Sequence, residues 1–182
     1  MFSEKLNLLK EQNLLRHIFD RESAQGPKII MQGRKYINFS SNDYLGLANH
    51  PYIVDNAKEA MDRFGFGAGA SRLLSGGTIL HHQLEEKVAQ LKGAEAALVF
   101  NSGYSANTGI IPALADRDTV LFSDQLNHAS IIDGCRLSKA ETIIYNHKDM
   151  THLEDCLNNK AAARKIVITD VIFLWYLLFS LK

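Results

Sequence analysis

Hydrophobic positions in the second half of the chain alternate between two spacings. Amphipathic stretches of helical period, at 103–115, 127–138 and 149–159, separate short apolar runs at 95–100, 119–123, 141–145 and 165–169. Strands that alternate with helices of about ten residues are typical of βαβ units and a parallel sheet. From residue 95 onward the sequence therefore predicts an α/β fold, in which ligands bind at the carboxyl ends of the strands.

The pattern before residue 95 is less regular. Leucine and isoleucine recur between charges over residues 3–18, which predicts an amphipathic helix that Gly26-Pro27 ends. The next predicted elements are, in chain order, a hairpin of Lys28–Met31 and Lys35–Phe39 around Gln32-Gly33, a helix at 53–64, a glycine-rich loop at 65–77 and a helix from Thr78 to about Leu91, stopped by Gly93.

Length and composition are those of an ordinary globular domain. The 182 residues are enough to bury a core, and 46% of them are hydrophobic and 22% charged. Twenty basic residues balance twenty acidic ones, so the chain has no positive field for nucleic acid and no basic face for a membrane surface. We expect partners among small molecules, with neither nucleic acid nor membrane bound.

Cysteine usage and the N-terminus indicate a compartment. Cys135 and Cys156 form no CxxC pair and lack the spacing of metal ligands, which is typical of a reducing cytosol. The N-terminal segment is broken by charges throughout and does not resemble a signal peptide. We therefore expect a cytoplasmic protein that holds no metal.

The chain ends on an apolar run. Val171–Phe179 contains nine apolar residues without a break, whereas a membrane span needs about 20. Asp170 interrupts any extension of this run toward the N-terminus. We expect 171–182 to be an apolar tail that does not anchor the chain in a membrane, although its composition is an aggregation hazard.

A cluster of small residues follows the apolar run at 95–100. The segment Asn101–Asn107 reads Asn-Ser-Gly-Tyr-Ser-Ala-Asn, and a helix is predicted to begin at about Gly103. The first turn of a helix carries unpaired backbone N–H groups and the positive end of the helix dipole, so it can hold a phosphate. The alternative is that these small residues only allow tight packing between a strand and a helix.

One unit further along, His128 follows the predicted strand at 119–123. Its flat ring is placed to cover the molecule to which such a phosphate belongs, and Asp124 is placed to orient that ring. The alternative is a partly buried histidine with a structural role only. Together the two segments predict a phosphorylated aromatic cofactor.

Other motifs in the sequence give weaker evidence for a functional site. Gly65-x-Gly67-x-x-Ala70 follows a predicted helix and not a strand, so it is not a dinucleotide-binding fingerprint. His81 and His82 precede Glu85 and Glu86 at helical spacing, but two ligands seldom make a metal site. His147 and His152 are predicted to be surface residues.

Several motifs in a fixed order resemble the α-oxoamine synthases, a family of pyridoxal 5'-phosphate enzymes. They are Asn38–Leu47, Gly67–Gly76, His82–Glu86, Asn101–Asn107, Leu126–Gly134 and Asn146–Asp149. The resemblance implies an α/β chain that forms the N-terminal part of an aspartate-aminotransferase-like fold (fold type I), with an incomplete, parallel-rich sheet flanked by helices. Its predicted divisions are an N-terminal helix and hairpin segment at 1–50, part of the large cofactor-binding domain at 51–170 and the tail at 171–182.

The resemblance also implies roles for individual residues. Gly103 and Tyr104 match the pair that lies against the cofactor phosphate, and His128 matches the histidine that stacks on the pyridine ring and borders the substrate. Arg16 matches an arginine that contacts the acyl substrate, and Asn42 lies in the motif on the substrate side. Ser75 lies in a loop expected to approach the neighbouring subunit, because members of the family are homodimers.

The implied activity is the decarboxylative condensation of an amino acid with an acyl thioester. The likeness is greatest to the branch that joins alanine to a pimeloyl thioester in biotin biosynthesis, with the glycine-acetylating branch as the alternative. A chain without activity that binds a full-length relative, or that is tethered to a membrane by its tail, is a further alternative.

The resemblance stops after Thr169-Asp170. The lysine that forms the internal aldimine with the cofactor, and the aspartate and histidine beside the pyridine ring, are expected beyond position 182, so none of the catalytic residues has a match here. We interpret the change at residue 171 as a frameshift or a premature stop. The chain alone is accordingly predicted to be an inactive fragment.

Overall fold

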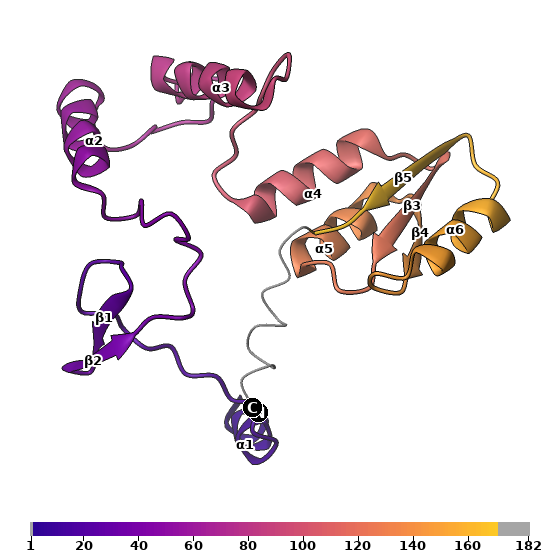
Figure 1. Ribbon diagram of the computed structural model, residues 1–182, viewed down its shortest axis with the longest axis horizontal. Helices are drawn as coiled ribbons and strands as arrows, with labels where there is room; N and C mark the ends of the chain where they lie inside the picture. The colour runs from indigo at the N-terminus through magenta and orange to yellow at the C-terminus, as the bar shows by residue number, and fades with distance from the viewer. Residues whose placement is uncertain (1, 171–182) are drawn as a thin grey trace. The chain divides into compact units, whose positions relative to one another are not determined.

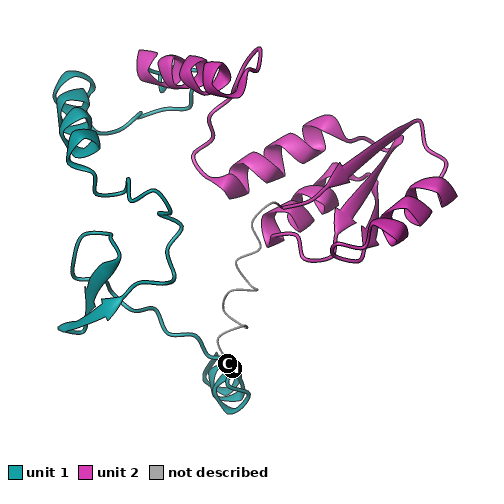
Figure 2. Cartoon of the chain, viewed as in Figure 1, with its two compact units in different colours: residues 1–78 teal, residues 79–182 magenta. Residues whose placement is uncertain are grey.

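The computed structural model describes residues 2–170 and divides the chain into two units, Met1–Thr78 and Ile79–Lys182 (Figure 2). The apolar tail predicted at 171–182 and the proposed frameshift lie outside the described residues. The boundary predicted at residue 50 falls inside the first unit, just before α2 (Pro51–Phe64), and stays a prediction.

The first helix is shorter than its hydrophobic pattern predicts. Helix α1 spans Phe2–Glu11, so the prediction of a helix to residue 18 is wrong. Asn13 adopts the left-handed conformation with φ 56°, and the amide of Leu14 then bonds the Leu9 carbonyl at 2.8 Å. Asparagine tolerates this conformation better than most residues, and a left-handed residue ends a helix.

The rest of the first unit follows the prediction closely. Strands β1 (Lys28–Met31) and β2 (Arg34–Ile37) pair antiparallel around Gln32 and Gly33, which both have positive φ. Two such residues give the tight turn whose twist matches a hairpin. Helix α2 begins with Pro51 in its first turn, where a missing N–H costs nothing.

The second unit contains the predicted parallel sheet (Figure 1). The strands are β3 (Thr119–Asp124), β4 (Glu141–Tyr145) and β5 (Arg164–Ile168), in the order β4-β3-β5. The helices are α3 (Ile79–Lys92), α4 (Gly103–Leu114), α5 (Ala129–Ser138) and α6 (Met150–Asn159). The bounds of all seven elements lie within two residues of their predicted ranges, and Thr78 directly precedes α3.

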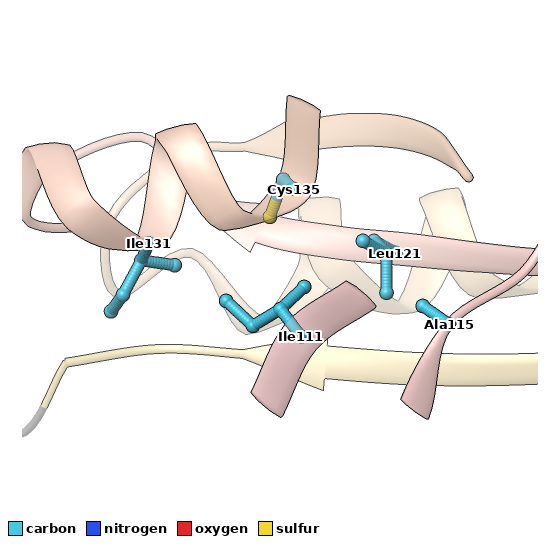
Figure 3. Close-up of a cluster of buried hydrophobic side chains, with 5 residues drawn as sticks. All are labelled: Ile111, Ala115, Leu121, Ile131 and Cys135. Carbon is cyan, nitrogen blue, oxygen red and sulfur yellow. The ribbon is translucent and has the colours of Figure 1, made fainter. Parts of the chain in front are cut away.

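Helices cover both faces of the sheet, because side chains of the central strand β3 alternate between them. Leu121 faces Ile111 of α4 and Ile131 of α5, in the cluster drawn in Figure 3. Phe122 faces the other way, toward Tyr145 and the α6 side chains. The connection from β3 to β4 contains α5, and the connection from β4 back past β3 to β5 contains α6. Because both connections are right-handed and run in opposite directions along the sheet, α5 and α6 lie on opposite faces.

One predicted strand is absent from this sheet. Residues 95–100 are not assigned to any strand, so that prediction is wrong for the described structure. A strand exists only where a neighbour accepts its backbone hydrogen bonds, and none of residues 2–170 pairs with this segment. Instead the amide of Val99 donates to the Glu85 carboxylate of α3 at 2.9 Å.

The carboxyl ends of the strands meet at one edge. Asp124 pairs with Tyr145 in register, and Ser123 pairs with Ile168. The loops that follow β3, β4 and β5 therefore lie next to one another. Across residues 2–170, none of the helices has the length and apolar character needed to cross a bilayer.

Candidate cofactor-binding site

The first turn of α4 presents backbone N–H groups. Ser102 caps the helix in an extended conformation, and its hydroxyl accepts from the Ser105 amide at 3.0 Å while its carbonyl accepts from Ala106 at 3.0 Å. Within residues 2–170 no acceptor is recorded for the amides of Gly103 and Tyr104. No atom of residues 2–170 lies within 4 Å of the position of a Cβ on Gly103, so a small side chain would fit there, and the free amides of this turn can bind an anion.

The side chain of Tyr104 joins α4 to α5. Its hydroxyl donates to the Asp133 carboxylate at 2.9 Å. This hydrogen bond and the negative charge of Asp133 raise the pKa of Tyr104, so the phenol keeps its proton at neutral pH. Asp133 also contacts Arg136 at 3.4 Å, one turn further along the same helix.

His128 caps the N-terminus of α5. Its Nδ1 lies 3.2 Å from the backbone nitrogen of Ser130 and 2.7 Å from the Ser130 hydroxyl. A backbone N–H can only donate, so Nδ1 is the acceptor and the ring proton of the neutral imidazole lies on Nε2. The residue is exposed, and the imidazole is held by its Nδ1 edge.

A hydrogen-bond relay connects this ring to α4. The Asn107 side-chain amide donates to the Ser130 hydroxyl at 2.9 Å, and that hydroxyl donates in turn to His128. Ser130 is 1% exposed, so water does not compete for these bonds. The relay ties the helix whose N-terminus carries Gly103 and Tyr104 to the histidine that the sequence singled out. Asn107 and Ser130 were not predicted as site residues, although both lie inside the motifs Asn101–Asn107 and Leu126–Gly134.

Close packing of α4 on α5 depends on Gly134. A Cβ on this residue would lie 2.7 Å from the Asn107 carbonyl oxygen and 2.8 Å from Cδ1 of Ile111. We expect Gly134→Ala to lower the free energy of unfolding by about 1 to 3 kcal/mol, because the backbone of α4 must shift. Chemical denaturation measures this, and Gly103→Ala is the control with open space around it. An unchanged unfolding midpoint for Gly134→Ala would contradict this packing.

Two predictions about nearby residues are wrong. The Asp124 carboxylate bonds His147 and not the ring of His128, and His147 is not a surface residue: Nδ1 of His147 lies 2.9 and 3.1 Å from the two carboxylate oxygens of Asp124. The two side chains are 8% and 3% exposed, respectively. Four residues separate Asp124 from His128 in the sequence, but the partner of Asp124 comes from the loop after β4.

Three predicted residues lie in the first unit. Arg16 is exposed in the segment after α1, and Asn42 is exposed in the loop between β2 and α2. Ser75 is exposed in the glycine-rich loop, beside Gly76, where a Cβ would overlap the carbonyl oxygen of Ala70. Gly103, Tyr104 and His128 all lie in the second unit, where the hydrogen bonds of Asn107 and Ser130 connect α4 to His128. Within residues 2–170 no three His, Cys, Asp or Glu side chains are grouped to hold a metal ion.

The arrangement fits a phosphorylated ring compound. Two backbone amides with no recorded acceptor within residues 2–170, beside two serine hydroxyls, are suited to a phosphate, and an exposed imidazole fixed at one edge is suited to lie against a flat ring. This chemistry is that of the cofactor which the motifs imply, pyridoxal 5'-phosphate.

The chain belongs to the aminotransferase class I and II family, whose model matches residues 34–173. It is 51% identical over 170 residues to an 8-amino-7-oxononanoate synthase of Geobacter sulfurreducens, covering 93% of this chain and 44% of that protein. It is 50% identical over 174 residues to the corresponding protein of Geotalea daltonii, with coverage of 94% and 44%. The predicted resemblance to α-oxoamine synthases is thereby confirmed.

Solved structures agree with this assignment. A lysine-to-alanine variant of a serine palmitoyltransferase from S. paucimobilis, solved with a bound PLP–myriocin aldimine, matches with a TM-score of 0.85 at 27% identity. The match covers 94% of this chain and 44% of that one. The predicted fold class, part of a fold type I enzyme, is confirmed, and the chain spans less than half the length of the proteins it matches.

Proposed function

We propose that this chain is the cofactor-binding part of a pyridoxal 5'-phosphate-dependent acyltransferase of the 8-amino-7-oxononanoate synthase type. The proposed reaction is the decarboxylative condensation of alanine with a pimeloyl thioester in biotin biosynthesis. Identity of about half to two such synthases supports the reaction type. The observation that carries the proposal is the relay from Asn107 through Ser130 to His128, because it connects a helix end suited to a phosphate with an imidazole suited to lie against a flat ring.

Each group of the second unit has a distinct task in this proposal. The amides of Gly103 and Tyr104 bind the phosphate, and the imidazole of His128 lies against the pyridine ring. With Nδ1 occupied by Ser130, the Nε2–H of His128 is left to donate to a bound substrate. When bound, the cofactor supplies an electron sink that makes the α-proton of the amino acid removable.

The family resemblance assigns roles on the substrate side to three residues of the first unit, and we include these roles in the proposal. The Arg16 guanidinium binds the tail carboxylate of the acyl thioester through a charge-assisted contact. Asn42 lines the substrate pocket, and Ser75 approaches the site of the neighbouring subunit in a homodimer. We place the protein in the cytoplasm, where the substrates are soluble thioesters and amino acids.

A comparison of two ligands tests the proposal. We expect the chain to bind pyridoxal 5'-phosphate at least about tenfold more tightly than pyridoxal, because charge-assisted hydrogen bonds to the phosphate contribute about 1.5 to 3 kcal/mol each. Titration followed by absorbance of the cofactor gives both affinities. Equal affinities for the two ligands would contradict a phosphate site.

A second measurement addresses the activity of the chain by itself. We propose that the 182-residue chain holds the cofactor without a covalent bond and shows no turnover. Borohydride reduction in the presence of pyridoxal 5'-phosphate, followed by peptide mapping, should label no lysine stoichiometrically. One lysine labelled to completion would show that the chain attaches the cofactor covalently.

A further inference from the structure

The turn that carries His128 is fixed at its first residue by a buried ionisable pair. We call residues Asp124–His128 the histidine turn. The Asp124 carboxylate accepts from the Leu126 amide inside the turn at 2.8 Å and lies 2.9 Å from Nδ1 of His147. The side chains of Asp124 and His147 are 3% and 8% exposed. His147, in the loop after β4, thus holds the first residue of the histidine turn in place.

The end of the histidine turn is fixed to the opposite neighbour, β5. Asn127 is 5% exposed and uses both ends of its side-chain amide. Its Nδ2 donates to the Ile168 carbonyl and to the Ser123 hydroxyl, both at 2.9 Å. Its Oδ1 accepts from the Asp170 amide at 2.8 Å. Asn127, the residue directly before His128, is therefore bonded to β5 and to the residue two positions after it, on the side of β3 away from β4.

These contacts fix the position of the turn's backbone and do not touch the imidazole of His128. The hydrogen bonds described above for His147 and Asn127 end on other residues, and within residues 2–170 the ring of His128 is bonded to Ser130. Main-chain bonds add to the anchoring, since the Gln125 amide donates to the Tyr145 carbonyl at 3.0 Å. With the turn bound to β4 and β5, the direction in which His128 leaves the backbone is set by the strands.

We propose that His147 and Asn127 are positioning residues that hold the histidine turn, and through it the His128 imidazole, in the place where the ring covers a ligand at the α4 terminus. This inference rests on the proposed function for the identity of the ligand. A platform displaced by about 1 Å loses much of its contact with a flat ring, so its supporting residues matter as much as the ring itself.

Three variants of the full chain test the proposal. His147→Phe keeps a flat ring of similar size and removes the N–H to Asp124, whereas His147→Asn restores an N–H donor near the position of Nδ1. His152→Phe is the matched control, because Nδ1 of His152 accepts from the Asn146 amide at 3.1 Å in the same loop without reaching the histidine turn.

Two readouts are compared: the heteronuclear {¹H}–¹⁵N NOE of the amides of 125–128, and the affinity for pyridoxal 5'-phosphate. We expect His147→Phe to lower the NOE values in the turn and to weaken binding about tenfold. His147→Asn should return both to within about threefold of the original chain, and His152→Phe should change neither. Asp124→Asn, which keeps the shape of the side chain and removes its charge, is expected to loosen the turn to a smaller degree and replaces His147→Phe if that variant does not fold.

The outcomes separate this proposal from the one on which it rests. Unchanged NOE values in His147→Phe, or an equal loss in His152→Phe, would overturn the positioning role. Failure of His147→Asn to recover either readout would also overturn it, because the donated hydrogen bond would then not be the cause. If the original chain binds no pyridoxal 5'-phosphate, the proposed function fails, while the NOE values still decide whether His147 holds the turn.

Discussion

Replacing Gly103 with proline should weaken binding of pyridoxal 5'-phosphate by about 10- to 100-fold without lowering the stability of the chain. Proline removes the backbone N–H at the first position of α4, and a charge-assisted hydrogen bond contributes about 1.5 to 3 kcal/mol. The helix itself tolerates the change, since proline is favoured at this position and its N–H serves no intrahelical bond. Ser102 already has φ −158° and ψ 157°, the extended conformation that a residue before proline requires.

The matched control is Gly103→Ala. It adds a Cβ at the same position, where no atom of residues 2–170 lies within 4 Å, and keeps the N–H. We expect its affinity for the cofactor to stay within about threefold of the original, because no hydrogen bond is lost. Cofactor titration and thermal melting of both variants provide the data. Similar affinities for the proline and alanine variants would show that this amide does not bind the phosphate.

Phe122→Ala should lower the free energy of unfolding by about 3 to 5 kcal/mol. Phe122 is 0% exposed at the centre of β3 and packs with Val120 and Tyr145 under α6. Removing its ring leaves a cavity that the parallel strands on either side cannot close, because their hydrogen bonds fix their spacing. A loss of this size is a large part of the stability of a typical domain.

Denaturant titration measures that loss, with Val167→Ala as the control. Val167 lies opposite Phe122 in register on β5 but is 45% exposed, so its truncation should cost less than about 1 kcal/mol. Equal losses for the two variants would mean that the face of the sheet toward α6 is not the packed core described for the second unit.

Most of the second unit could be predicted because its signals are local. The hydrophobic period and the small-residue turns can each be recognised within about ten adjacent residues. These signals were enough to predict β3, α5, β4, α6 and β5. The segment 95–100 has the same apolar pattern, yet it forms no strand within residues 2–170, because strand pairing depends on a partner distant in the sequence. The end of α1 at Asn13 was missed for a different reason, since asparagine signals a left-handed turn far more weakly than glycine does.

The candidate site was predictable in part for the same reason. Gly103, Tyr104 and His128 lie inside motifs that can be recognised from adjacent residues. The contacts that support them join positions far apart: 23 residues separate Asp124 from His147 and Asn107 from Ser130, and 41 separate Asn127 from Ile168. A spacing of four between Asp124 and His128 pointed to the wrong partner, because only the sheet brings the loop after β4 to this edge.

The most direct test of the central claim is an amide ¹H–¹⁵N spectrum of the chain titrated with pyridoxal 5'-phosphate. A phosphate bound to the first turn of α4 should shift the signals of Gly103 and Tyr104 more than any others, and the backbone amide signal of His128 should move with the same midpoint. Shifts concentrated elsewhere in the chain, with these three signals unmoved at saturation, would contradict it.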